Sequence, residues 1–165
     1  MRYVNDGGLF MLPVLVFSFG YDIVWQVNYI EEKTMNTPMK TILVDAVFCF
    51  VSADGEIFSA MRDLLDSYPN MKIILTGAND AQFKKFGLDK MPYEVFTLKH
   101  DPEKTDPKYY ETLLAHFILT KEDVVYFEHA AEAVKSAESV GIKTYFYDDG
   151  KKDLVSLKKF LDENA

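Results

Sequence analysis

The sequence has few residues with which to build a disulfide or a zinc site. It contains one cysteine, Cys49, and three scattered histidines, His100, His116 and His129. A single cysteine excludes an intrachain disulfide, and the histidines lack the spacing typical of zinc ligands. We therefore expect no structural metal and a reducing, cytoplasmic location. Cys49 is expected to be a buried apolar side chain, because no nearby histidine or lysine would lower its pKa.

The chain is also short of positive charge. It has 18 lysine and arginine residues against 26 aspartate and glutamate residues, which gives a formal net charge of −8. An acidic surface repels phosphate backbones, so we expect no nucleic-acid partner. A small phosphorylated substrate is not excluded, because binding it requires only local positive charge.

A long hydrophobic run is missing as well. The apolar run Leu9–Phe19 is too short to cross a bilayer, and Gly20 and Asp22 interrupt its extension. The start of the chain also differs from a signal peptide, which begins with a net positive charge, because the charge of Asp6 offsets that of Arg2. We therefore expect no membrane partner.

The composition changes near residue 38. Residues 1–38 contain the one tryptophan, Trp25, and Asn36-Thr37-Pro38 indicates a break. We predict an N-terminal extension of unclear role at 1–38 and one folded domain at 39–165. The alternative is that residues 1–38 form an amphipathic helix or hairpin packed on the domain. The length of 165 residues and the hydrophobic content of 48% suit a single domain with its own core.

From Met39 onward, short apolar runs alternate with helical patterns. The runs predict strands at 41–44, 72–75, 93–98, 124–127 and 143–147. The spacing of apolar positions predicts helices at 56–67, 79–86, 106–117, 132–140 and 154–161. This alternation implies right-handed crossovers and a parallel sheet with helices on both faces. The predicted fold class is therefore α/β, a Rossmann-like three-layer sandwich, and the segments between strands leave no room for a cap domain.

Side chains suited to chemistry follow three of the predicted strands. Asp45, Thr76 and Glu128 stand at strand ends, and Lys104 precedes the helix predicted at 106–117. Ligands of open parallel sheets bind outside the carboxyl ends of the strands. An attacking acid, a hydroxyl and a lysine that hold oxygens, and a second acid that places a cation would together suit a phosphate-like group.

Four segments, in order, resemble the four motifs of the haloacid dehalogenase-like (HAD) superfamily. They are Asp45-Ala46-Val47, Leu75-Thr76-Gly77-Ala78-Asn79, Lys104-Thr105-Asp106-Pro107 and Val125-Tyr126-Phe127-Glu128-His129. The resemblance covers nearly everything from Met39 to the C-terminus. It implies a small member of the superfamily without a cap domain.

The resemblance also implies roles for individual residues. Asp45 would be the nucleophile, Thr76 would hydrogen-bond the phosphoryl oxygens, and Lys104 would neutralise charge. Asp45, Val47 and Glu128 would be the positions around a Mg²⁺ ion. The implied activity is that of a magnesium-dependent, phosphatase-type hydrolase.

Two positions depart from the family pattern. Val47 stands where the first motif has its second aspartate, the general acid and base of phosphatases, and losing such a group costs on the order of 10²–10⁴ in rate. Glu128-His129 replaces an acid pair in the fourth motif, so Glu128 alone would supply a carboxylate. We expect His129 to be structural or solvent-facing, with replacement of the missing proton donor as the alternative.

Each candidate also has a purely structural interpretation. Asp45 could cap the following turn, and Thr76 could bind loop amides. Lys104 could be one solvated charge in the charged loop 99–108, and Glu128 could be an acid at a helix N-terminus.

Three functions are compatible with these observations. The leading one is a phosphatase-like hydrolase that uses Asp45, lacks its general acid and acts on a small phosphorylated substrate. The second is a catalytically inactive family member that binds a ligand or a protein partner through the same pocket. The third, a phosphoacceptor domain of the response-regulator kind, fits worse, because it requires an acidic pair near the start of the chain and its lysine after a later strand.

Overall fold

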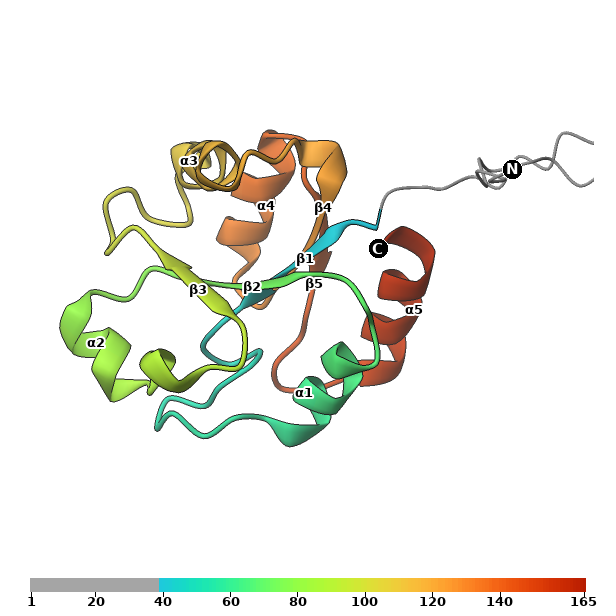
Figure 1. Ribbon diagram of the computed structural model, residues 1–165, viewed down its shortest axis with the longest axis horizontal. Helices are drawn as coiled ribbons and strands as arrows, with labels where there is room; N and C mark the ends of the chain where they lie inside the picture. Colours follow the sequence, from blue (N-terminus) through green and yellow to red (C-terminus); the bar gives the residue numbers. More distant parts are fainter. Residues whose placement is uncertain (1–38) are drawn as a thin grey trace, which may run out of the picture. The chain divides into compact units, whose positions relative to one another are not determined.

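The structure, a computed structural model, describes residues 39–165, so the predicted extension at 1–38 lies outside the described residues. Five strands form one parallel sheet in the order β3-β2-β1-β4-β5 (Figure 1). They are β1 (Thr41–Asp45), β2 (Lys72–Thr76), β3 (Glu94–Thr97), β4 (Val124–Glu128) and β5 (Lys143–Phe146). All five residues of β1 are buried, as expected for a central strand of a parallel sheet. The predicted strands and the α/β, Rossmann-like fold class are confirmed.

Helices cover both faces of the sheet. They are α1 (Ser59–Asp66), α2 (Asp80–Lys85), α3 (Pro107–Phe117), α4 (Ala131–Ser139) and α5 (Leu154–Asn164), with 3₁₀ turns η1 (Leu88–Lys90) and η2 (Lys121–Asp123). In Figure 1, α3 and α4 lie on one side of the strands and α1 and α5 on the other. None of the helices among residues 39–165 is long and apolar enough to cross a membrane.

Two hydrophobic cores lie between the sheet and its helices. The alternation of side chains along β1 sends Leu43 to one core and Ile42 and Val44 to the other. The first core contains buried residues of α3 and α4, including Tyr109, Leu113 and Ala137. The second contains buried residues of α1 and α5, including Met61, Leu65, Leu157 and Leu161. Full burial of each large aliphatic side chain contributes about 1.5–3 kcal/mol.

The loop between β1 and α1 differs from the prediction. The helix expected from residue 56 begins at Ser59. The backbone before it forms hydrogen bonds within the loop instead, from the Ser52 amide to the Glu56 oxygen and from the Phe58 amide to the Phe50 oxygen. Val51 forms isolated bridges with Val47 and with Ile57. Cys49 is fully buried, as predicted. The loop therefore closes the carboxyl end of β1 with a compact, partly apolar turn.

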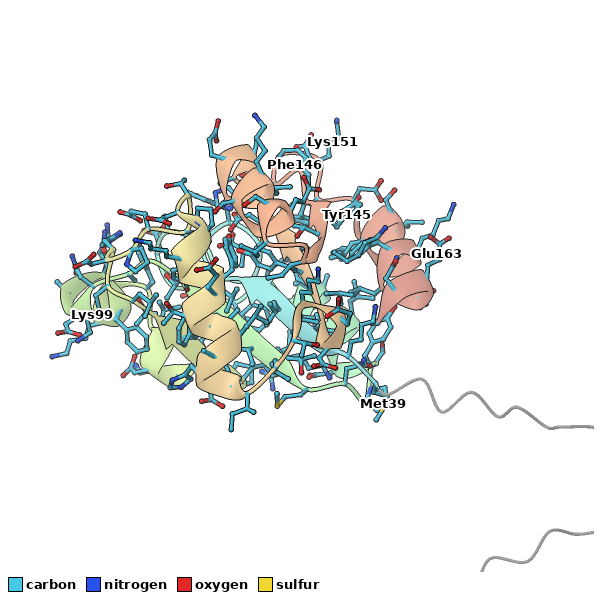
Figure 2. All side chains as sticks on the ribbon, turned by 90° about the horizontal axis from the view of Figure 1, so that it is seen from above. Met39, Lys99, Tyr145, Phe146, Lys151 and Glu163 are labelled. Atoms are coloured by element: carbon cyan, nitrogen blue, oxygen red, sulfur yellow. The ribbon has the colours of Figure 1, made fainter. Side chains whose placement is uncertain are left out.

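Strand β5 forms one edge of the sheet, and its two aromatic residues are labelled in Figure 2. The ring of Tyr145 packs on Phe160 of α5, with centroids 5.2 Å apart. Phe146 points to the opposite face and is 49% exposed. The centre of the sheet, by contrast, is covered by a core on each face.

No inserted domain lies over the carboxyl ends of the described strands. The segment from β1 to β2 holds α1, and the segment from β2 to β3 holds α2 and η1. The predicted absence of a cap within residues 39–165 is therefore confirmed.

Candidate active site

The candidate site lies at the point where the strand order reverses. The chain runs outward from β1 through β2 to β3, and then returns to the other side of β1 with β4 and β5. Such a switch point opens a crevice at the carboxyl ends of the strands. Asp45 lies beside Leu75 of β2, and Val44 lies beside Phe127 of β4. The predicted adjacency of the strand ends near 45, 76 and 128 is confirmed.

Lys104 reaches this edge from the turn before α3. The side chain of Asp106 caps α3 by accepting a hydrogen bond from the Lys108 amide at 2.9 Å, and Pro107 occupies the first turn. The Nζ of Lys104 donates to Asp45 Oδ1 and, at 2.5 Å, to Glu128 Oε2. With 15% of its side chain exposed, Lys104 is not a solvated loop charge.

The ion pairs hold the charges of this network in place. Burial raises the pKa of Glu128, but Lys104, His129 and Tyr126 lower it by more, so that the pKa falls to about 2. Burial lowers the pKa of Lys104, but Asp45 and Glu128 raise it by more, to above its ordinary value. The Glu128 carboxylate and the Lys104 ammonium are therefore both charged at neutral pH.

His129 joins the same two carboxylates from the other side. Its Nδ1 lies 2.6 Å from Asp45 Oδ2 and 2.9 Å from Glu128 Oε1. Hydrogen bonds with Asp45 and Glu128 raise the pKa of His129 to about 10, against the effect of burial. The expectation of a solvent-facing histidine was wrong, whereas a structural role agrees with this pairing. Replacement of the missing proton donor by His129 stays a prediction. The usable signal was its position next to Glu128, directly after a strand at the carboxyl edge.

Glu128 has two further partners. The hydroxyl of Tyr126 donates to Oε2 at 2.5 Å, and the amide of Ala130 donates to Oε1 at 2.8 Å. Ala130 precedes α4 directly, so the interpretation of Glu128 as an acid at a helix N-terminus holds alongside its place in the ion network. Tyr126 was not anticipated, although strand alternation places it on the same face as Glu128.

Thr76 lines the same pocket as Asp45. Its Oγ1 accepts a hydrogen bond from the Ala78 amide at 3.1 Å, as in the structural interpretation. The hydroxyl proton remains able to donate. The phenol of Tyr109 donates to the backbone oxygen of Thr76 at 2.8 Å and so ties α3 to the end of β2.

The pocket is open to the surface and has a volume of about 210 Å³. Its lining also includes Gln82, His100 and Glu103, which the sequence patterns did not single out. The imidazole of His100 bonds Glu103 Oε1 at 2.9 Å and Gln82 Oε1 at 2.5 Å. A Cβ at Gly77 would lie 3.2 Å from His100 Nδ1, so the glycine leaves room for this ring. Sequence patterns miss such residues because only the folded chain brings them together.

Val47 lines the pocket, and its side chain has no group that can donate or accept a proton. Residues with exchangeable side-chain protons do line it, namely Thr76, Gln82, His100, Lys104 and His129. Val47, at the position that corresponds by resemblance to the general acid of HAD phosphatases, is therefore apolar.

The residues predicted for magnesium do not fit the ion as they are arranged. Mg²⁺ requires oxygen ligands at 2.0–2.1 Å in near-octahedral geometry. Asp45 Oδ2 and Glu128 Oε1, the pair of oxygens not held by Lys104, are already joined by Nδ1 of His129. Cys49 lies near Asp45 and His129, but burial raises the pKa of its thiol, so it stays protonated and is a poor ligand. Val47 could contribute only its backbone oxygen.

No family model matches the sequence. A search of curated proteins also finds no match. Solved structures, however, show a clear likeness. A HAD family enzyme from Bacteroides thetaiotaomicron has a TM-score of 0.58 and 14% sequence identity, covering 72% of this chain and 98% of that one. A mutant of the same enzyme, in complex with magnesium and inorganic phosphate, has a TM-score of 0.55 and 12% identity, covering 68% and 95%.

A HAD-superfamily hydrolase of subfamily IA from Geobacter sulfurreducens is similar as well. It has a TM-score of 0.51 and 12% identity, with 73% of this chain and 96% of that chain covered. This chain therefore has the fold of HAD family enzymes, over nearly the whole length of those neighbours.

Proposed function

We propose that this chain, which has the fold of HAD family enzymes, is a phosphatase-like hydrolase of that superfamily with Asp45 as its nucleophile. The observation that carries the proposal is the position of Asp45. Asp45 is 2% exposed and stands at the end of the central strand, where it lines an open pocket with Lys104 and Thr76. A small phosphorylated molecule is the proposed substrate.

In the first step, the transfer of the phosphoryl group to Asp45, each residue has a separate role. A carboxylate oxygen has more than one lone pair, so Asp45 can attack phosphorus while it still accepts hydrogen bonds from Lys104 and His129. The new bond joins Asp45 oxygen to phosphorus, and the bond from phosphorus to the leaving oxygen breaks, with its electron pair on that oxygen. Lys104 and the Thr76 hydroxyl would stabilise the charge on the phosphoryl oxygens.

The apolar Val47 determines which substrates suit the site. An aryl or acyl phosphate releases an anion that does not need protonation, whereas an alkyl phosphate requires an acid. Water that cleaves the aspartyl-phosphate needs a base, and Val47 is not one. We expect slow turnover of aryl and acyl phosphates and little turnover of sugar phosphates, in line with a cost of about 10²–10⁴ for a missing acid or base.

The proposed reaction does not depend on magnesium. The Bacteroides thetaiotaomicron enzyme has been crystallised with magnesium and inorganic phosphate. A bound Mg²⁺ would polarise the phosphoryl group. In this chain the two oxygens that would bind it contact His129.

A binding module is the second candidate, and one observation favours it. Every carboxylate oxygen of Asp45 and Glu128 already has a donor within the described residues. Such a closed network suits a site that holds a ligand or a protein partner without reacting with it. The two candidates share the pocket and differ only in whether Asp45 forms a covalent bond.

Turnover of an aryl phosphate by Asp45→Asn separates the two candidates. We expect slow release of p-nitrophenol from p-nitrophenyl phosphate by the wild type, and a loss of at least about 10²-fold in Asp45→Asn. Asp54→Asn, the same change in the exposed part of the loop after β1, should leave the rate unchanged. Melting temperatures of both variants would show that they fold.

Activity that survives Asp45→Asn would assign the reaction to another residue. A wild type without any turnover of aryl or acyl phosphates would favour the binding module.

A further inference from the structure

His129 holds one nitrogen between carboxylates from two neighbouring strands. Nδ1 lies 2.6 Å from Asp45 Oδ2, at the end of β1, and 2.9 Å from Glu128 Oε1, at the end of β4. Both acids are almost completely buried. Two carboxylates this close in a poorly solvated place repel each other unless a cation lies between them.

The four carboxylate oxygens are divided into two pairs. Lys104 Nζ bridges Asp45 Oδ1 and Glu128 Oε2, and His129 Nδ1 bridges Asp45 Oδ2 and Glu128 Oε1. Each of the two nitrogens thus joins one oxygen of Asp45 to one oxygen of Glu128. The two acids are therefore held together by side chains of the chain alone.

A divalent cation would need the second pair of oxygens. An ion bound to both would lie between Asp45 and Glu128, which is where Nδ1 of His129 lies. Magnesium also prefers oxygen ligands and is held poorly by imidazole nitrogen. The ion and the ring therefore compete for one position.

Contacts outside the network help to keep the ring in this position. Phe48 packs an edge-to-face contact on the His129 ring, with centroids 5.2 Å apart and planes at 70°. Phe48 itself adopts φ 74°, a left-handed conformation that is strained for a bulky residue. The compact loop after β1 thus presents Phe48 to the ring, and the ring is placed by two acids and one aromatic side chain.

We propose that the side chain of His129 takes the place of a divalent cation in this site, so that the reaction proposed above for Asp45, on which part of this inference rests, runs without magnesium. His129 pairs with the two acids from the side opposite Lys104. The site then needs no metal to bring Asp45 and Glu128 together.

Magnesium binding, measured by calorimetric titration, tests this proposal without relying on activity. We expect no binding by the wild type at millimolar Mg²⁺. His129→Asp removes the ring and adds a third acid, so it should bind Mg²⁺ at least about tenfold more tightly than the wild type. His116→Asp, the same change on the exposed face of α3, should behave like the wild type.

A second variant protects the test against a failure of folding. His129→Asn removes the ring without adding a negative charge, and it should gain weaker Mg²⁺ binding than His129→Asp. A rise of melting temperature on addition of Mg²⁺, present in both His129 variants and absent in the wild type, would support the same conclusion.

Binding of Mg²⁺ to the wild type as tightly as to His129→Asp would overturn the proposal. Turnover of p-nitrophenyl phosphate by the wild type should be equal in EDTA and in Mg²⁺, and a rate that disappears in EDTA would overturn it too. A wild type that neither turns over substrate nor binds Mg²⁺ would contradict the proposed hydrolase while leaving the role of His129 supported.

Discussion

At the residue scale, the site is a network of two acids and two basic side chains. Asp45 and Glu128 are bridged by Lys104 on one side and by His129 on the other. Removing one partner of such a buried pair typically costs about 3–5 kcal/mol, because a charge is left without compensation. The network therefore orients Asp45, and the loss of any one of its charged partners should destabilise the carboxyl end of the sheet.

The absence of a proton-transfer group can be tested by restoring one. We predict that Val47→Asp raises turnover of alkyl phosphates by about tenfold or more, because Val47 lines the pocket and an acid there could protonate the leaving oxygen. Turnover of aryl phosphates should rise by a smaller factor, because the restored group helps only the hydrolysis of the aspartyl-phosphate there and not the departure of the leaving group. Initial rates on a sugar phosphate and on p-nitrophenyl phosphate measure the difference.

Val155→Asp is the matched control for this prediction. Val155 lies on α5 and is 82% exposed, so it adds the same charge away from the pocket. Equal rates on alkyl phosphates for Val47→Asp and the wild type, with both folded, would show that the missing acid is not what limits the site.

The site was predicted from sequence only in part. Asp45, Thr76, Lys104 and Glu128 follow from the order of motifs and from their places at strand ends, and the structure brings all four together. The role of His129 did not follow, because no local pattern shows that its ring lies between two acids from neighbouring strands. The aspartyl chemistry remains a prediction, whereas the arrangement of Asp45, Glu128 and His129 does not fit the predicted magnesium site.

At the scale of elements, the turn before α3 positions Lys104. Asp106, two residues after Lys104, caps this helix by accepting a hydrogen bond from the Lys108 amide. We predict that Asp106→Ala lowers the free energy of unfolding by about 1 kcal/mol. Urea denaturation measures the change, and the exposed Asp89→Ala in η1 is the control. A loss no larger than that of Asp89→Ala would show that the cap does not stabilise α3.

The elements were predicted well wherever burial decides them. Strand β1 reads as an unbroken apolar run because both of its faces are covered, and its helical partners keep a regular apolar spacing. The start of α1 was misplaced by three residues, at 56 instead of Ser59. Ile57 continues the apolar spacing of the helix, but it bridges to Val51 in the loop, which is a tertiary contact that no helical pattern shows.

At the scale of the whole molecule, residues 39–165 contain a complete sheet with a core on each face. We predict that a chain beginning at Met39 melts at nearly the same temperature as the full-length chain, because the described unit has its own core. Circular dichroism melting of both proteins tests this. A large drop for the shortened chain would favour the alternative in which residues 1–38 pack on the domain.

The covalent step at Asp45 is the central claim, and trapping the aspartyl-phosphate tests it most directly. Val47 supplies no base for hydrolysis, so the phosphorylated enzyme should persist after incubation with acetyl phosphate. Intact mass spectrometry, followed by mapping of the peptide that contains Asp45, should show one added phosphoryl group in the wild type and none in Asp45→Asn. The absence of the adduct in the wild type, or its survival in Asp45→Asn, would contradict the account.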